Sequence, residues 1–197
     1  MTKRMLKDQR RQQLLTLARE MVSQQGAGSL TLSTLAQKAG VTKPVTYRHF
    51  HTKEGLLSEL YRFYDTQFIE SVKQAKQQQC NSLSALIELV CHGYIDCALR
   101  CGSEYESIIA ALQGCEAFSA LSHDIRNHYA EFYAELFGEY LPPSAQDNKL
   151  LFYAVHGAID EIANAVACGD ADKTAAVSSL RVIIANILQS ASGINHG

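Results

Sequence analysis

Residues 42 to 53 gather side chains that carry positive charge or donate hydrogen bonds. The set includes two hydroxyls, a phenol, an imidazole and two ammonium groups, from Thr42, Thr46, Tyr47, His49, Lys43 and Lys53. Such groups bind phosphate oxygens, and lysine can also donate to the edge of guanine. Pro44 and Val45 between them, with the methyl group of Thr46, can contact the methyl group of thymine. The chemistry that this segment favours is recognition of a polyanion.

Two short helices joined by a tight turn would position these side chains. One apolar stripe at three-to-four spacing predicts a helix over residues 32–39, with Thr31 as its N-cap. Gly40 ends this helix, because glycine takes the left-handed conformation without a steric penalty. Thr42 can cap a second helix over 43–50, in which Pro44 lies in the first turn. A helix-turn-helix with a short polar second helix is suited to the major groove of DNA.

The run AGVTKPVTYRHFHTKEGLL, residues 39–57, resembles the DNA-binding signature of the tetracycline-repressor (TetR) family of bacterial transcriptional regulators. The sequence departs from that pattern at Thr46, where an aliphatic residue is usual, and at Thr34, where an acid often completes a capping box. The resemblance implies phosphate contacts from Thr42, Tyr47, His49 and Lys53, and it turns Lys43, Pro44, Val45 and Thr46 toward the groove. It covers about fifty residues; beyond Leu60 only length and helical pattern agree.

The charge distribution supports this interpretation. Residues 1–55 contain ten Lys or Arg and three Asp or Glu, a balance of +7. Residues 56–197 contain eight and seventeen, a balance of −9, so the net charge of −2 conceals a basic end and an acidic body. The basic first helix, expected over about 6–24, would also bring Arg4, Lys7, Arg10 and Arg11 near phosphates.

Other functional classes find little support in the sequence. It has no HExxH, GxSxG, Walker or GxGxxG pattern, so we expect no catalytic residues, no metal site and no cofactor. No uncharged apolar run of eighteen residues predicts a membrane helix, and the N-terminus does not resemble a secretory signal. The expected location is cytoplasmic.

The remaining pattern is helical throughout and predicts an all-α protein of about nine helices. After a long helix from Thr52 toward residue 79, we expect helices over 82–100, 104–112, 116–140, 145–168 and 172–190, with a break at residues 101–103. The expected domains are a three-helix DNA-binding domain, 1–51, and a helical ligand-binding and dimerisation domain, 52–197.

The last two predicted helices favour a homodimer. The final helix has a wide apolar face, and helix 145–168 carries small residues that permit close helix approach. The alternative is that both helices complete the core of a monomer. TetR-like proteins dimerise in this way, and reading a palindromic double-stranded DNA operator requires two copies.

The resemblance also implies a small-molecule inducer bound among the body helices, which would release a repressor from its operator. Polar anchors for such a ligand are His92, Tyr94, His128, Tyr153 and His156, with Phe132 in an aromatic lining. The alternatives are a histidine at the core edge for His128, and a solvated face for Tyr153 and His156. A helical small-molecule carrier is a further alternative for the whole chain.

Cysteine chemistry gives a last alternative, a thiol-based redox or metal sensor on the same scaffold. Cys97 and Cys101 are one helical turn apart, compatible with a metal clip or a redox pair. Both project onto the apolar side of their helix, where cysteine behaves as a small hydrophobic residue. Core packing is therefore the favoured role.

Overall fold

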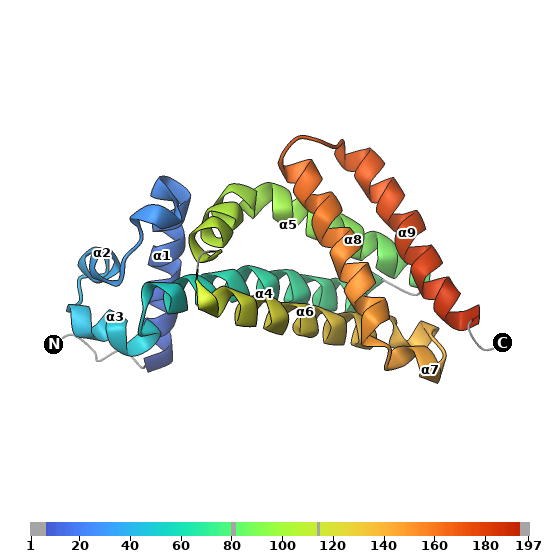
Figure 1. Cartoon of the computed structure of the whole chain (residues 1–197), viewed down its shortest axis with the longest axis horizontal. Coiled ribbons are helices and arrows are strands. Elements are labelled where there is room, and N and C mark those ends of the chain that lie inside the picture. Colours follow the sequence, from blue (N-terminus) through green and yellow to red (C-terminus); the bar gives the residue numbers. More distant parts are fainter. Residues whose placement is uncertain (1–6, 80–81, 114, 194–197) are drawn as a thin grey trace. The chain divides into compact units, whose positions relative to one another are not determined.

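Helices account for nearly all of the chain in the computed structural model, which describes residues 7–79, 82–113 and 115–193 (Figure 1). Within these ranges there are nine α-helices, one of them only four residues long, a short 3-10 helix and no strand. The elements are α1 (Lys7–Ser29), α2 (Leu32–Lys38), α3 (Lys43–Phe50), α4 (Lys53–Gln79), α5 (Leu83–Leu112), α6 (Glu116–Phe137), η1 (Gly138–Tyr140), α7 (Pro143–Gln146), α8 (Lys149–Ala167) and α9 (Lys173–Gly193). The all-α prediction is confirmed.

Helix α5 differs from the prediction, which divided it at residues 101–103. It runs unbroken from Leu83 to Leu112, and Gly102 keeps a helical conformation. A glycine stop requires positive φ, as at Gly40 (64°) and Gly169 (84°), and Gly102 does not adopt it. A glycine inside a helix costs only about 1 kcal/mol, so the packing of the two flanking segments outweighs it.

Two further helix ends were shifted in the prediction. Helix α1 continues to Ser29, although Gly26 interrupts it with a φ of 75°, close to the predicted end. The predicted helix 145–168 is divided into α7 and α8, because Asn148 caps α8 by accepting a hydrogen bond from the amide of Leu151 at 3.4 Å. An asparagine N-cap satisfies one of the amides that a new helix leaves without a partner.

The chain forms two compact units, each of which is described by itself. The first contains the described residues up to Tyr64 together with Ser103–Leu121. The expected domain boundary at 51/52 thus lies at the turn from α3 to α4, inside this unit. Its core is apolar and fully buried, with Leu14, Ala18, Leu30, Leu35, Leu56, Leu57 and Leu60 among its side chains.

Residues 103–112 of α5 are attached to α1 and α4 within this first unit. The amide of Ala27 donates to the hydroxyl of Ser107 at 2.7 Å, directly after the break at Gly26. The hydroxyl of Tyr64 donates to Glu104, and the guanidinium of Arg19 lies over the ring of Phe63 at 4.4 Å. Polar and cation–π contacts therefore supplement the apolar core at this position.

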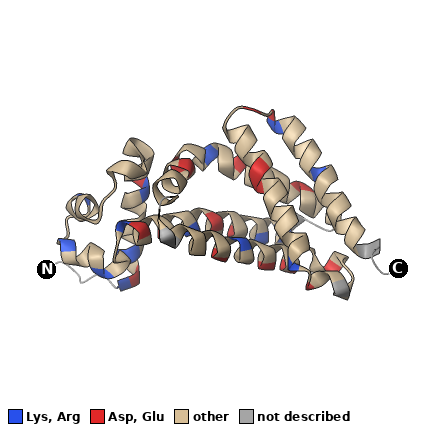
Figure 2. Cartoon of the chain, viewed as in Figure 1, with Lys and Arg blue, Asp and Glu red and all other residues tan. Residues whose placement is uncertain are grey.

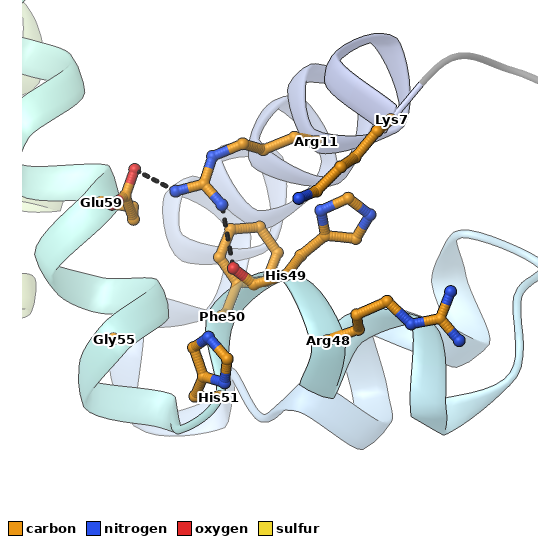
Figure 3. A pocket seen from close by; sticks show the side chains of 8 residues that line it. All are labelled: Lys7, Arg11, Arg48, His49, Phe50, His51, Gly55 and Glu59. Atoms are coloured by element: carbon orange, nitrogen blue, oxygen red, sulfur yellow. Dashed lines mark hydrogen bonds and ion pairs between the residues drawn. The ribbon is translucent and has the colours of Figure 1, made fainter.

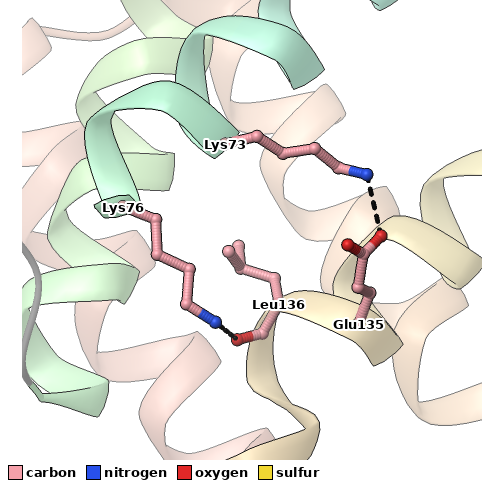
Figure 4. Close-up of polar contacts among 4 residues, drawn as sticks. All are labelled: Lys73, Lys76, Glu135 and Leu136. Carbon is pink, nitrogen blue, oxygen red and sulfur yellow. Dashed lines mark hydrogen bonds and ion pairs between the residues drawn. The ribbon is translucent and has the colours of Figure 1, made fainter. Parts of the chain in front are cut away.

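The second unit contains the described residues of 65–102 and 122–193. Figure 4 shows α4 attached to α6 within it: Lys73 pairs with Glu135 at 2.8 Å, and Lys76 donates to the carbonyl of Leu136 at 3.3 Å. Lys76 thereby satisfies one of the carbonyls that the C-terminus of α6 leaves without an intrahelical partner. Helices α8 and α9 form an antiparallel pair joined by a tight turn at Gly169 (Figure 1).

Candidate nucleic-acid interface and interior polar cluster

Helix α2 is capped more completely than the sequence suggested. The hydroxyl of Thr31 accepts from the amide of Thr34, and the hydroxyl of Thr34 accepts from the amide of Thr31 at 2.9 Å. Thr34 therefore completes the capping box itself, without the acid that is common at this position. Gly40 has positive φ, as predicted, and ends the turn before α3.

Thr46 connects α3 to α2 and is not available to a duplex. Its side chain is fully buried, and its hydroxyl donates to the carbonyls of Leu32 and Lys43, both at 2.9 Å. The prediction that Thr46 contacts a base is therefore wrong. A buried hydroxyl needs a partner, and the carbonyl of Leu32 in the first turn of α2 provides one, since a carbonyl oxygen has two lone pairs. This hydrogen bond takes the place of the aliphatic packing that the family pattern suggests.

The outward side of α3 presents most of the other predicted residues. Thr42, Lys43, Pro44 and Tyr47 are exposed, Tyr47 by 49%, and Val45 is half-buried. Thr42 stands at the N-cap position of α3, but its hydroxyl makes no capping hydrogen bond, contrary to the prediction, whereas Pro44 occupies the first turn as expected. The exposed side chains thus include a hydroxyl, an ammonium and a phenol on one short helix and its N-cap.

Lys53 is the first residue of α4, directly after the turn that follows α3. It is half-buried, and its ammonium donates to the carbonyl of Gly28 at 3.1 Å. This hydrogen bond holds the cation between α1 and α4, where it remains partly open to solvent. Its position is compatible with the predicted phosphate contact.

A strained turn sets the direction of α3 relative to α4. His51 has φ 62° and ψ −55°, and the amide of Thr52 donates to the carbonyl of Phe50 at 2.7 Å. This is the rarer form of γ-turn, which is unfavourable for a residue other than glycine. The hydroxyl of Thr52 then caps α4 by accepting from the amide of Gly55 at 3.0 Å.

Arg11 fixes the C-terminal end of α3. Its guanidinium donates to the carbonyl of His49 at 2.9 Å, pairs with Glu59 at 2.7 Å and lies 5.3 Å from the ring centre of Phe50. We expected Arg11 to reach phosphates, but the structure uses it to join α1, α3 and α4. Nothing in the local sequence indicates this role, since Arg11 and His49 are 38 positions apart.

Positive charge collects around this end of α3. Figure 2 shows Lys and Arg concentrated on α1, α3 and the start of α4, and Figure 3 shows Lys7 extending from α1 toward the ring of His49 while Arg11 reaches Glu59 and the carbonyl of His49. Burial, followed by Arg11, Lys7, Arg48 and Arg10, lowers the pKa of His49. The Nδ1 atom of this ring is buried and makes no hydrogen bond to any described residue.

Part of the predicted ligand set converges inside the second unit. Tyr94, Phe132 and His156 belong to one aromatic cluster with Phe68, Tyr129 and Tyr133, in which the rings of Tyr129 and His156 stack at 4.1 Å. Tyr94 donates to Asp160 at 2.7 Å, and Tyr129 donates to Asp65 at 2.9 Å. We call these eight residues the interior polar cluster.

Burial favours the neutral forms of Tyr94, Tyr133 and His156 in the interior polar cluster. Burial raises the pKa values of Tyr94 and Tyr133, and it lowers the pKa of His156 against the opposing effect of Asp160. The hydroxyl of Tyr133 and Nδ1 of His156 are buried without a hydrogen-bond partner among the described residues. Buried polar atoms without a partner are unusual in a protein core.

Three residues of the predicted ligand set lie outside this cluster. His92 is exposed and 3.9 Å from Glu88, and His128 is exposed on α6. The hydroxyl of Tyr153 donates to Asn127, so this residue belongs to a polar contact between α6 and α8. The structure therefore does not bring these three residues together with the others, because residues at the margin of an apolar stripe can face either way.

Asp65 was missed in the sequence although a signal was present. It is 5% exposed and lies on the apolar stripe of α4, between Tyr61 and Phe68. An acid at such a position is rarely buried unless its oxygens are hydrogen-bonded. A carboxylate inside an apolar stripe therefore predicts a donor on a neighbouring helix, here Tyr129.

The cysteines give little support to a sensor. Burial, together with Cys101, raises the pKa of the Cys97 thiol to about 11, which leaves very little thiolate at neutral pH. Among the described residues, no group of three or more His, Cys, Asp or Glu side chains could hold a metal ion.

Comparison with known proteins agrees with this geometry. Residues 14–60 match the family "Bacterial regulatory proteins, tetR family". The "HTH-type transcriptional regulator AcrR" of Shigella flexneri is 37% identical over 84 residues, 42% of this chain and 39% of that protein, so the chain spans about two fifths of its length.

Solved structures extend the likeness to the fold of the whole chain. A TetR-family transcriptional regulator from Syntrophomonas wolfei has a TM-score of 0.72 and 13% identity, covering 96% of this chain and 100% of that one. The multidrug binding protein EbrR, complexed with imidazole, has a TM-score of 0.67 and 19% identity, covering 91% and 89%. At such identities the likeness concerns the fold.

Proposed function

Residues 14–60 match the tetR family of bacterial regulatory proteins, and on that premise we propose that this chain is a DNA-binding transcriptional regulator of that family. The observation that carries the proposal is the surface of α3. Thr46 faces inward and ties α3 to α2, while Lys43, Pro44 and Tyr47 on the same helix face solvent. This is the arrangement a recognition helix needs, with one side held rigidly and the other free for base edges.

The proposed DNA contacts are of two kinds: phosphate contacts position the protein on the duplex, and base contacts specify the sequence. Lys43, Pro44 and Val45 enter the major groove, and Thr42, Tyr47, His49 and Lys53 bind phosphates. Lys43→Ala should then relax sequence preference at a cost of about 1–3 kcal/mol of binding free energy. Lys53→Ala should instead weaken binding to DNA of every sequence, and the slope of log affinity against log salt concentration should fall by about one.

Both variants can be measured by fluorescence anisotropy on a site selected from a random duplex library and on unselected DNA. Equal losses on both duplexes for both variants would remove the division between positioning and specifying contacts. Failure of the wild-type chain to select any site at moderate salt would remove the proposed function itself.

The regulator acts as a homodimer through α8 and α9. Leu150 (74%), Val182 (60%) and Ile183 (36%) are exposed on these helices, next to the exposed small residues Ala154 and Gly157. Residues 173–191 are long and apolar enough to cross a membrane, yet only 33% of this apolar segment is buried within one chain. A two-fold partner that covers this face accounts for the apolar surface and provides the second half-site reader.

Sedimentation of full-length variants tests the dimer. Val182→Glu should produce a monomer and weaken binding to a palindromic site far more than to unselected DNA. Leu99→Glu is the matched control, because Leu99 is also an exposed apolar residue (48%) but lies on α5. Dissociation in both variants, or in neither, would contradict an interface on α8 and α9.

The interior polar cluster is the place we propose for a small-molecule inducer. The unsatisfied Tyr133 hydroxyl and His156 Nδ1 support it, as does the multidrug binding activity in the name of EbrR, a protein of similar fold. An inducer needs only to prefer the arrangement that does not bind DNA, and the unbroken α4 links residues of both units. Loss of release by a screened inducer in His156→Ala, with operator affinity kept, would support this site.

A further inference from the structure

The interior polar cluster joins two carboxylates to six rings from four helices of the second unit. Its members are Asp65 and Phe68 on α4, Tyr94 on α5, Tyr129, Phe132 and Tyr133 on α6, and His156 and Asp160 on α8. These eight residues include two acids and no Lys or Arg. Arg126 on α6 is exposed, and its guanidinium lies 6.0 Å from the ring centre of Tyr153, outside the cluster. The cluster itself therefore presents negative charge among aromatic rings.

Asp65 places one of these charges in the interior. The residue is 5% exposed, and its carboxylate accepts a hydrogen bond from the hydroxyl of Tyr129 at 2.9 Å. That bond satisfies a lone pair, but a phenol carries no charge that would balance the carboxylate. Asp160, which accepts from Tyr94 at 2.7 Å, is exposed. A cation bound beside Asp65 would be attracted strongly, because little water is present there to screen the charges.

The hydroxyl of Tyr133 is the second observation that points to a ligand. Tyr133 is completely buried, its ring lies 5.9 Å from that of Tyr129 and 6.3 Å from that of His156, and its hydroxyl bonds to no described residue. After burial and Cys91, Asp160 and Asp65 contribute to the raised pKa of Tyr133, so both carboxylates act at this hydroxyl. Nδ1 of His156 is also buried without a partner among the described residues. Both atoms can accept a hydrogen bond, as the N–H groups of an ammonium require.

The rings of the cluster offer a further attraction for a cation. Tyr129 and His156 stack at 4.1 Å between ring centres, and the ring of Tyr94 lies 5.0 Å from that of Phe68. The face of an aromatic ring is negative and attracts a cation, and its area also binds apolar groups. A ligand suited to this cluster therefore combines a positive charge with an apolar body.

We propose that the interior polar cluster binds an amine that is protonated at neutral pH and carries an apolar body, its ammonium donating to Asp65, Tyr133 and Nδ1 of His156. The proposal rests on the inducer site proposed above and names the chemical class of its ligand. At Asp65 the ammonium takes the place of the Tyr129 hydroxyl, which joins α6 to α4. Binding thus replaces a contact of α4, the helix that follows α3 in the chain.

Isothermal titration of the full-length chain without DNA, using three probes of the same body, tests the charge. Phenethylammonium should bind at least about tenfold more tightly than phenethyl alcohol, and hydrocinnamate should bind most weakly, because hydrogen bonds to charged groups are the stronger ones. Equal affinities, tighter binding of the carboxylate, or no binding of the ammonium up to about 10 mM would overturn the proposal. None of these outcomes bears on DNA binding, which the selected-site assay measures separately.

Two variants assign the binding to the cluster. Asp65→Asn keeps an oxygen for the Tyr129 hydroxyl and removes the charge, so it should weaken phenethylammonium by about tenfold to a hundredfold and leave phenethyl alcohol nearly unchanged. Asp170→Asn is the matched control, an exposed acid between α8 and α9. Tyr133→Phe should weaken phenethylammonium by about tenfold without loss of stability. Unchanged affinity for the ammonium in both cluster variants would overturn the proposal.

NMR locates the probe without any substitution. In a chain with isotope-labelled tyrosine and histidine, nuclear Overhauser effects should connect the methylene protons of phenethylammonium to the rings of Tyr133 and His156. Effects confined to tyrosines outside the cluster, such as Tyr153, would overturn the assignment even where the ammonium binds.

Discussion

Replacing Gly55 with alanine tests the geometry that holds α3 against α4. A Cβ atom at this position would lie 2.3 Å from the carbonyl oxygen of Phe50 and 3.5 Å from the hydroxyl oxygen of Thr52. Real Cβ atoms essentially never come closer than 3.0 Å to another heavy atom, so the two backbones must separate by at least 0.7 Å (3.0 − 2.3). The obstacle is backbone and cannot rotate away, unlike a flexible side chain.

The same carbonyl takes part in the γ-turn at His51, and the carbonyl before it is bound by Arg11. A forced shift therefore disturbs both contacts. Overpacking of this kind costs about 1–3 kcal/mol, from which the gain of alanine over glycine in a helix, about 0.5–1 kcal/mol, must be subtracted. We expect Gly55→Ala to lower the free energy of unfolding by about 1–2 kcal/mol and to weaken DNA binding through the displaced end of α3.

Urea denaturation followed by circular dichroism, with anisotropy on duplex DNA, would measure both effects. Gly28→Ala is the matched control, since Gly28 has a helical conformation and no atom within 4 Å of an added Cβ. It should be neutral or slightly stabilising. Gly55→Ala with wild-type stability and wild-type affinity would refute the close approach of α3 and α4.

Three further predictions concern single side chains. His51→Gly should raise the free energy of unfolding by about 1 kcal/mol, because glycine tolerates the positive φ of 62°; lower stability in urea denaturation would contradict the strain. Tyr129→Phe should lower the free energy of unfolding by about 1–3 kcal/mol, because it removes a hydrogen-bond donor to the buried carboxylate of Asp65. Tyr133→Phe should be neutral or stabilising, because the hydroxyl of Tyr133 has no described partner. Equal effects of the two variants would refute this distinction. Iodoacetamide should alkylate Cys97 much more slowly than the exposed Cys168 at pH 8, as measured by mass spectrometry. The rate at Cys97 should increase only toward pH 11, because its raised pKa leaves little thiolate at lower pH. Equal rates at the two cysteines would support the thiol-sensor alternative.

Signals that act within a few residues were enough to predict the helix-turn-helix. Thr31, Gly40 and Pro44 have the capping, stop and first-turn roles expected of them. Each role depends on the backbone conformation of a residue and its immediate neighbours, so neither the rest of the chain nor a partner is needed to anticipate it. The same holds for the separation of basic and acidic residues along the chain, which is a property of composition alone.

Helix ends depended on more than local signals. Gly102 had the residue type of a stop, but α5 continues through it, because a glycine ends a helix only where the following segment can turn away. His128 was placed in the ligand set from its position on a helical projection, and it is exposed. A projection locates a residue to within about one position, which decides the outcome at the margin of an apolar stripe.

Contacts between distant residues were decided by the tertiary structure. Arg11 binds the carbonyl of His49 across 38 positions, and Tyr129 binds Asp65 across 64. Such pairs form only when packing sets the rotation and spacing of whole helices, and no periodicity within either helix records the position of the other. The amino-acid sequence by itself thus determined that the chain carries a basic helix-turn-helix and an acidic helical body. The packing of helices, which depends on many weak contacts at once, decided that Thr46 faces inward, that Arg11 holds α3 and that Asp65 lies buried beside Tyr129.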